Sequence, residues 1–228
     1  MKENRTLRYL TRAMLAGCAI SFGCIGNLMA PDALSGAIIF SFGFTMVIVF
    51  DLLLYTEVAQ ELVNPPGGKL TTKSALSTVF KLFWGFAGNT LGCLIIKLLV
   101  LWTNLYPTIK YKAGAIVHQR IMLESYFGLF CLGMLCNALI YVAVRGYKNT
   151  RNRVSGYALL LFGITTFVIS GFEHCVADTF YCLICGHDFV NVPRLLAVFI
   201  GNAIGGVCME IWVKNATKGK VNTDEKYI

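Results

Sequence analysis

The stretch GFEHCVAD, Gly171–Asp178, decides how the chain must fold, because it places ionisable side chains at the end of an apolar run. The run Gly156–Phe172 is marginally long for a membrane span, and Glu173 and His174 follow it at once. Ionisable groups at membrane depth are costly and usually mark a pathway or a proton relay. Only histidine exchanges a proton near neutral pH without a large change in its pKa. The alternative interpretation is that both residues cap a helix at the membrane interface.

The composition of the whole chain indicates a membrane protein. Of its 228 residues, 56% are hydrophobic and 14% are charged, with a mean hydropathy of +0.64. A soluble domain typically carries about 25% charged residues. The formal charge of +8 could suggest nucleic acid, but the 20 basic residues fall in short clusters between apolar runs. We therefore expect a lipid bilayer around the chain and no nucleic-acid partner.

The apolar runs predict six membrane spans. Each can supply most of the roughly 20 apolar residues that cross the hydrocarbon layer. The first is too long for the core of a cleavable signal peptide. The predicted spans are Tyr9–Ala30, Ala33–Tyr55, Ser77–Thr103, Ile121–Val144, Gly156–Phe172 and Leu195–Val213.

The basic residues predict the orientation of these spans. If both termini are cytoplasmic, 15 basic residues lie on the inner side and 4 on the outer side, with Lys97 inside the third span. Cytoplasmic loops are enriched in lysine and arginine. We therefore expect a multi-pass protein of the cell membrane with both termini in the cytoplasm.

The chain also repeats itself weakly. GNTLG at Gly88–Gly92 recurs as GNAIG at Gly201–Gly205, and polar residues interrupt the second and fifth spans. Thr56 and His174 lie 118 residues apart, which is close to the offset between the two glycine motifs. Three spans in each half require the halves to be inverted, and inverted halves with broken helices place a polar site near the bilayer midplane. We expect one transmembrane channel domain, with repeat halves at about 1–106 and 107–213 and a cytoplasmic tail at 214–228.

Four segments together resemble the formate/nitrite transporters, a family of formate, nitrite and hydrosulfide channels. GFEH at Gly171–His174 is similar to the segment around the family's central histidine, and GNAIGG at Gly201–Gly206 to its sixth-helix motif. GMLCNALIYVAV at Gly133–Val144 resembles the fourth helix, and WGFAGNTLG at Trp84–Gly92 the third. The four segments occur in the family's order and cover nearly the whole chain.

The resemblance implies an all-α membrane fold of six helices in two inverted three-helix repeats. The protomer would be aquaporin-like, with helices 2 and 5 broken, and five copies would form a homopentamer in which each protomer has its own pore. The resemblance places the central histidine at His174, a partner threonine at Thr56 and an asparagine at Asn202, with Glu173 beside them in the substrate pathway. The implied apolar constrictions correspond to Phe40, Phe44, Leu54, Tyr55 and Phe167.

The chain departs from the family pattern at three positions. The family usually has an acidic residue three positions before the loop threonine, where this chain has Leu53, and a small residue after it, where this chain has Glu57. A lysine at the start of helix four, which helps to attract anions, has no match in register, and Arg120 lies near that place. These departures bear on substrate preference and gating more than on the fold.

We expect a transport protein rather than an enzyme, with no cofactor and no bound metal. The transported solute would be formate or nitrite, with hydrosulfide as a further candidate, and His174 would exchange a proton with it. One alternative is an aquaporin-like pore for neutral solutes, but the paired Asn-Pro-Ala motifs are absent from the sequence. The other is a redox or metal protein built on Cys182, Cys185 and His187, which lacks a second C-x-x-C pair. The sequence assigns no role to Asp51 or Lys97.

Overall fold

The computed structural model describes residues 5–65, 69–186 and 190–217. Within these ranges every regular element is a helix, which confirms the all-α prediction. The elements are α1 (Arg5–Met29), α2 (Ala33–Val49), α3 (Tyr55–Val58), the 3-10 turn η1 (Ala59–Leu62), α4 (Thr72–Leu101), α5 (Tyr106–Ile116), the π-helical turn η2 (Val117–Met122), α6 (Tyr126–Asn149), α7 (Arg153–Ile169), α8 (Cys175–Cys185) and α9 (Val192–Ala216).

Among the described residues, four helices are long and apolar enough to cross a membrane: α1 from Thr6, α4, α6 and α9. The apolar helices α2 and α7 have 17 residues each, and α8 has 11. Large apolar side chains remain exposed along the outside of α4 and α9, including Phe80, Phe83 and Trp212. Such a surface suits lipid, in which exposed apolar side chains carry no cost.

The starts of several helices are set by capping side chains. Asp32, Thr71, Ser125, Asn152 and Asn191 each accept a hydrogen bond from a backbone N–H in the first turn of the helix that follows. These caps satisfy backbone donors that have no partner inside the helix. They also explain why α4, α7 and α9 begin before the predicted spans, which followed hydropathy alone.

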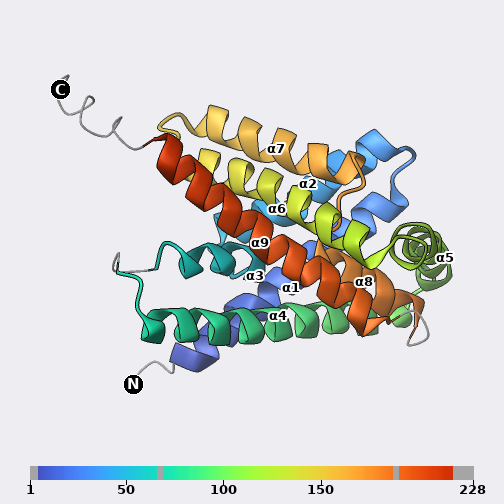
Figure 1. Ribbon diagram of the computed structural model, residues 1–228. Helices are drawn as coiled ribbons and strands as arrows, with labels where there is room; N and C mark the ends of the chain where they lie inside the picture. The colour runs from blue at the N-terminus through green and yellow to red at the C-terminus, as the bar shows by residue number, and fades with distance from the viewer. Residues whose placement is uncertain (1–4, 66–68, 187–189, 218–228) are drawn as a thin grey trace.

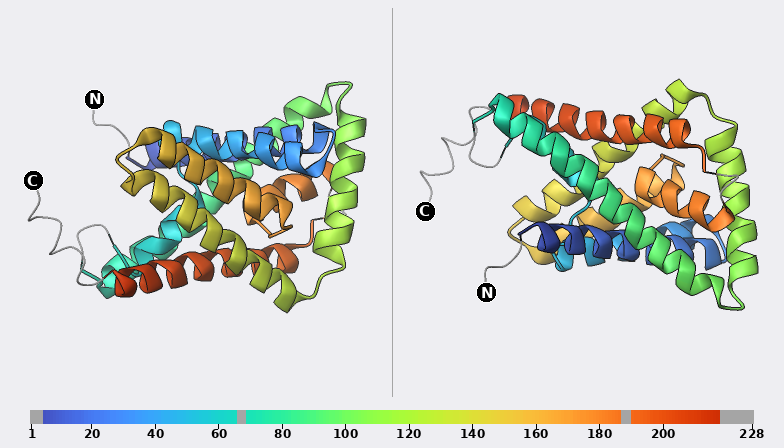
Figure 2. Two further views of the ribbon diagram at one scale, coloured as in Figure 1. Left: turned by 90° about the horizontal axis from the view of Figure 1, so that it is seen from above. Right: turned by 90° about the horizontal axis from the view of Figure 1, so that it is seen from below.

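The long helices pack in two sets that are joined through α2 and α7. Helix α1 packs on α4 and α2, and α6 packs on α9 and α7, while α2 and α7 contact each other. Helix α5 with η2 crosses one end of the bundle, nearly perpendicular to the other helices (Figures 1 and 2). The predicted fourth span began at Ile121, but this residue lies in η2. The long helix α6, which corresponds to that span, starts after the Ser125 cap.

The two glycine motifs allow these helices to approach closely. A Cβ added at Gly92 would lie on the carbonyl oxygen of Met14 in α1, and one added at Gly205 on that of Met134 in α6. Backbones this close leave no room for a side chain. The packing role that their spacing predicts is therefore observed at both motifs.

Two helices end in the same kind of break. At the end of α2, Asp51 adopts φ +49°, and the N–H of Leu52 donates to the carbonyl of Val47 over 2.8 Å. At the end of α7, Gly171 adopts φ +72°, and the N–H of Phe172 donates to the carbonyl of Phe167 over 3.1 Å. A left-handed residue followed by this 6→1 hydrogen bond is a Schellman motif, which stops a helix.

The positions of the breaks differ from the sequence prediction in two ways: the second and fifth predicted spans end too late, and the predicted 118-residue offset between the halves is too short. Helix α2 ends at Val49 instead of continuing to Tyr55, and α7 ends at Ile169 instead of Phe172. Equivalent residues of the breaks differ by 120 in number, as Asp51 and Gly171 do. The counterpart of His174, which caps α8, is therefore Leu54, which caps α3, and not Thr56.

Candidate functional site

The side chain of Asn89 on α4 bridges the break between α2 and α3. Its Oδ1 accepts from the backbone N–H of Tyr55 over 3.1 Å, and its Nδ2 donates to the carbonyl of Leu53 over 2.9 Å. The second Nδ2 hydrogen bond reaches the carbonyl of Ala13 in α1 over 2.8 Å. One buried amide thus satisfies backbone groups that the break leaves without helical partners.

Asn202 on α9 does the same for the break between α7 and α8. Its Oδ1 accepts from the N–H of Cys175 over 3.0 Å, and its Nδ2 donates to the carbonyls of Glu173 and Gly133, both over 2.8 Å. Its Oδ1 also accepts from the hydroxyl of Tyr55 over 2.9 Å. Two donors and two acceptors exhaust the capacity of an amide, so Asn202 holds the break and has no hydrogen bond left for a solute.

The break at α8 fixes His174 at its N-terminus. The imidazole is 1% exposed, and its Nδ1 accepts a 3.4 Å hydrogen bond from the N–H of Ala177. A neutral imidazole that accepts at Nδ1 carries its proton on Nε2. Within the part of the chain that the structure describes, Nε2 has no hydrogen-bond partner. His174 therefore presents a free N–H donor in a buried setting.

Aromatic rings surround the imidazole. The ring centroids of Phe44 and Phe167 lie 5.3 Å and 6.1 Å from that of His174, with tilted or edge-on geometry. Phe40 lies 5.8 Å from Phe167 and 6.0 Å from Phe44. The structure thus brings together three of the residues expected at a constriction, beside the expected histidine.

The other residues expected near the histidine are placed differently. The ring of Tyr55 stacks on Phe199 at 4.6 Å and its hydroxyl donates to Asn202, so this side chain packs against α9. Leu54 is buried as the residue that caps α3. Thr56 is also buried, and its hydroxyl has no hydrogen-bond partner, while its carbonyl accepts from Asn137 over 3.3 Å.

Glu173 and Arg120 form an ion pair at the edge of this site. The Nε of Arg120 lies 2.9 Å from Oε1 of Glu173, and its Nη2 donates to the carbonyl of Phe172 over 3.1 Å. The Glu173 side chain is 1% exposed, against 28% for Arg120. Arg120 was expected to attract anions, but its charge is largely compensated by this carboxylate.

A small cavity joins the ion pair to the histidine. Its volume is about 20 Å³, and its lining includes Arg120, Phe40, Phe167, His174 and Asp178. This volume holds about one water molecule. The cavity shows that space beside the imidazole extends toward the Arg120 end of the bundle.

Asp178 and Asn137 are parts of the site that sequence reasoning missed. Asp178 lies one helical turn after His174 on α8 and is 2% exposed. The i, i+4 spacing between the two residues was the available signal, because residues four apart share one face of a helix. Asn137 donates to the carbonyl of Asn202 over 2.6 Å and so links α6 to α9.

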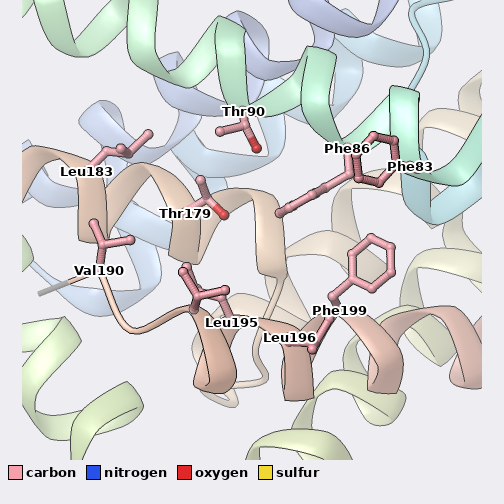
Figure 3. A pocket seen from close by; sticks show the side chains of 10 residues that line it. Phe83, Phe86, Thr90, Thr179, Leu183, Val190, Leu195, Leu196 and Phe199 are labelled. Carbon is pink, nitrogen blue, oxygen red and sulfur yellow. The ribbon is translucent and has the colours of Figure 1, made fainter. Parts of the chain in front are cut away.

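A larger pocket lies elsewhere, between α4, α8 and α9 (Figure 3). It has a volume of about 350 Å³, and apart from the hydroxyls of Thr90 and Thr179 its lining is apolar. It contains none of the expected pathway residues. Its surface suits a hydrocarbon group rather than an anion.

The cysteine cluster on α8 does not form a metal site among the described residues. Cys182 and Cys185 are buried and carry free thiols. Within residues 5–65, 69–186 and 190–217, no three histidine, cysteine or acidic side chains are grouped as metal ligands. His187, the third member of the cluster considered from the sequence, lies outside the described residues.

Two charged residues near the first break form surface ion pairs. Asp51 pairs with Arg12 at 2.6 Å, and Glu57 pairs with Lys148 at 2.9 Å. The second pair ties α3 to the end of α6. Lys97 lies part-exposed on α4.

Comparison with known proteins places this architecture in a family. The family profile described as formate/nitrite transporter matches residues 2–215. The chain belongs to the formate/nitrite transporter family. It is therefore a membrane transport protein and not an enzyme, as the four sequence motifs indicated.

Individual members of the formate/nitrite transporter family are distant relatives. The formate channel FocA of Haemophilus influenzae is 27% identical over 214 residues, which cover 81% of this chain and 74% of FocA. The formate channel FocA of Escherichia coli is 27% identical over 211 residues, covering 79% and 73%. FocB of Escherichia coli, also a formate channel, is 24% identical over 236 residues, covering 86% and 82%.

Solved structures share the fold. A pentameric formate channel with formate bound superposes with a TM-score of 0.78 at 22% identity, covering 95% of this chain and all of that chain. A formate/nitrite transporter family ion channel gives a TM-score of 0.80 at 24% identity, covering 94% and 92%.

Proposed function

We propose that this chain is a membrane channel for small monovalent anions, namely formate or nitrite with hydrosulfide as a further candidate, and that their path passes beside His174. The observation that carries the proposal is the unpartnered Nε2 of a buried histidine, at the N-terminus of a half-helix and among three phenylalanine rings. Relatives named as formate channels support the choice of solute.

The arrangement suits an anion that crosses as its neutral acid. A bare anion pays several kcal/mol to enter an apolar constriction, whereas formic or nitrous acid avoids most of that cost. A hydrogen bond from Nε2–H would stabilise the anion at the narrowest point and favour exchange of a proton there. Asn202 and Asn89 would contribute by holding the backbone of the breaks, and Thr56 would offer its free hydroxyl.

We also propose six membrane crossings in two inverted halves. Helix α2 with α3 and η1 would complete the second crossing, and α7 with α8 the fifth. A 17-residue helix spans about 25 Å, so each needs the segment beyond its break to cross the hydrocarbon. The matched hydrogen bonds at residues 120 apart support the inverted repeat, and the excess of inner basic residues supports cytoplasmic termini.

A homopentamer follows as a further proposal. The solved structure described as a pentameric formate channel matches this fold over 95% of the chain. The exposed apolar side chains of the long helices provide surfaces that subunits and lipid could share. Cross-linking in membranes followed by mass measurement tests the number of subunits.

Flux through proteoliposomes tests the function directly. The purified protein is reconstituted, and entry of formate, nitrite and hydrosulfide is measured at two pH values. We expect flux of at least one of these anions, and a His174→Phe variant with altered pH dependence. His118→Phe is the matched control, because His118 is exposed on η2, outside the site. Absence of flux for all three anions would refute the proposed function, and an unchanged pH profile in His174→Phe would refute the role of the imidazole.

A further inference from the structure

Arg120 and Asp178 line the cavity beside His174, and Glu173, which is ion-paired with Arg120, adds a second buried carboxyl group next to it. Glu173 and Asp178 are 1% and 2% exposed, and Arg120 is the basic group beside them. Arg120 forms an ion pair with Glu173, and among the described residues it makes no ion pair with Asp178. Two ionised carboxylates and one guanidinium would leave a net charge of −1 in a nearly dry space, which is costly.

The hydrogen bonding of the two carboxyl groups indicates how the cost of burying this net charge is avoided. Oε2 of Glu173 and Oδ2 of Asp178 are both buried without a donor. Glu173 directly precedes His174, the residue that caps α8, and Asp178 lies in the first turn of this helix, so both carboxyl groups lie at the same end of α8. Two carboxylates offer only acceptors, but one proton between them supplies a donor and satisfies both oxygens. Carboxyl pairs that share a site commonly hold one proton in this way.

The other titratable groups within electrostatic range of Asp178 do not compensate its charge. They are thiols and phenols from α1, α3, α6 and α8, which are neutral at pH 7. The imidazole of His174 lines the same cavity, and its accepting Nδ1 fits the neutral form. These neighbours are Cys24, Tyr55, Cys136, Cys175, Tyr181 and Cys182.

We propose that Glu173 and Asp178 share one resident proton, which keeps the cavity beside His174 electrically neutral. With the proton bound, the charge of Arg120 is balanced by one carboxylate. When the proton is lost to solvent, the charge of the cavity changes from 0 to −1. If the chain conducts anions, as proposed above, this loss repels the permeating anion, so the carboxyl pair sets how flux declines toward alkaline pH.

Infrared spectroscopy of the reconstituted protein tests the shared proton without any need for flux. The carbonyl stretch of a protonated carboxyl group lies apart from the bands of carboxylates. We expect this band at neutral pH in the wild type and its loss in Asp178→Asn, which keeps the size of the side chain. Glu210→Gln is the control, because Glu210 is buried near the other end of α9 and accepts a hydrogen bond from Asn64. A band that persists unchanged in Asp178→Asn would overturn the proposal.

Measurements of anion flux test whether the carboxyl pair sets the decline of flux toward alkaline pH. At alkaline pH we expect Asp178→Asn to exceed the wild type on the order of tenfold, the effect of removing one uncompensated charge near the path. At acidic pH the two should agree, and Glu210→Gln should follow the wild type throughout. Equal profiles for Asp178→Asn and wild type would overturn the regulatory role. A wild type without flux, but with the infrared band, would refute the channel function and leave the shared proton standing.

If Asp178→Asn does not assemble, the charge-conserving variant Asp178→Glu takes its place. It retains a second carboxyl group in the cavity, so the proposal predicts that the infrared band remains. Loss of the band in an assembled Asp178→Glu protein would contradict it.

Discussion

Asn89 and Asn202 make the same three hydrogen bonds in the two halves of the chain. Each amide oxygen accepts from the first residue of a half-helix, and each amide nitrogen donates to the carbonyl two residues earlier and to a neighbouring helix. Away from water, such backbone groups cost several kcal/mol when unpaired. These two side chains are therefore what permits the broken helices.

Replacing either asparagine by aspartate should destabilise the protein. Aspartate keeps the accepting oxygen but loses both donors, which leaves two buried carbonyls unpaired and facing a carboxylate. We expect a loss of about 2–4 kcal/mol for Asn89→Asp and for Asn202→Asp. Thermal unfolding in detergent measures the effect.

Asn191→Asp provides the matched control for this prediction. The side chain of Asn191 only accepts, from the N–H of Arg194 over 3.2 Å. Aspartate caps a helix equally well, so stability should change by less than about 0.5 kcal/mol. Equal effects at positions 191 and 202 would contradict the role assigned to the donors.

Tyr55→Phe should lower stability and leave the selectivity of flux unchanged. The tyrosine hydroxyl donates to Asn202 over 2.9 Å, and its ring stacks on Phe199. Loss of this hydrogen bond costs about 0.5–1.5 kcal/mol. Melting temperature and the ratio of formate to nitrite flux, measured on one preparation, separate this structural role from a place in the constriction. A changed ratio at unchanged stability would restore Tyr55 to the pathway.

Adding a methyl group at the helix crossings should disrupt packing. Gly92→Ala and Gly205→Ala place a Cβ on backbone carbonyls of the adjacent helix, so we expect losses of about 1–3 kcal/mol or failure to assemble. Gly114→Ala on α5 is the control, because the nearest atom to its added Cβ is Cys185 Sγ at 3.9 Å. There the higher helix propensity of alanine should stabilise by up to about 1 kcal/mol. Size-exclusion profiles and melting temperatures compare all three variants.

Asp32 should make stability depend on pH in the acidic range. Hydrogen bonds from the hydroxyl and N–H of Ser35 lower the pKa of this exposed carboxyl group, which caps α2. A lowered pKa in the folded state means that the contribution is present above the ordinary value of about 4 and is lost as pH falls through the folded value. Asp32→Asn keeps the cap without the charge, so its melting temperature should fall less between about pH 5 and pH 3. Parallel pH curves for wild type and variant would contradict this assignment.

Hydropathy and motif spacing sufficed for the helical class, the approximate positions of the long helices and the family. Polar residues indicated that the second and fifth spans are interrupted, but the ends of α2 and α7 were misplaced, because hydropathy cannot detect where a helix stops inside an apolar run. Asp51, with its left-handed backbone, ends α2 six residues before the apolar run does. Helix α5, which lies across one end of the bundle, was also missed, because its basic residues Lys110 and Lys112 suggested a loop (Figure 2).

The candidate site was predictable in part. The resemblance to the family implied a constriction that includes Phe40, Phe44 and Phe167, and the structure brings these three rings together beside His174. The direction of Tyr55 was not predictable, because it depends on which face of a four-residue helix meets α9. Asp178 was passed over because its significance depends on its position in one cavity with Arg120, beside the Arg120–Glu173 ion pair, and only tertiary contacts create this arrangement.

The order of these elements along the chain bears on biosynthesis. The break after α2 is synthesised before Asn89, and the break after α7 before Asn202. Each break therefore contains backbone groups whose partner belongs to a helix that is made later. If the breaks lie in the membrane as proposed, a nascent chain that ends before Asn89 or Asn202 would leave these groups unpaired there, so we expect such a truncated chain not to fold stably.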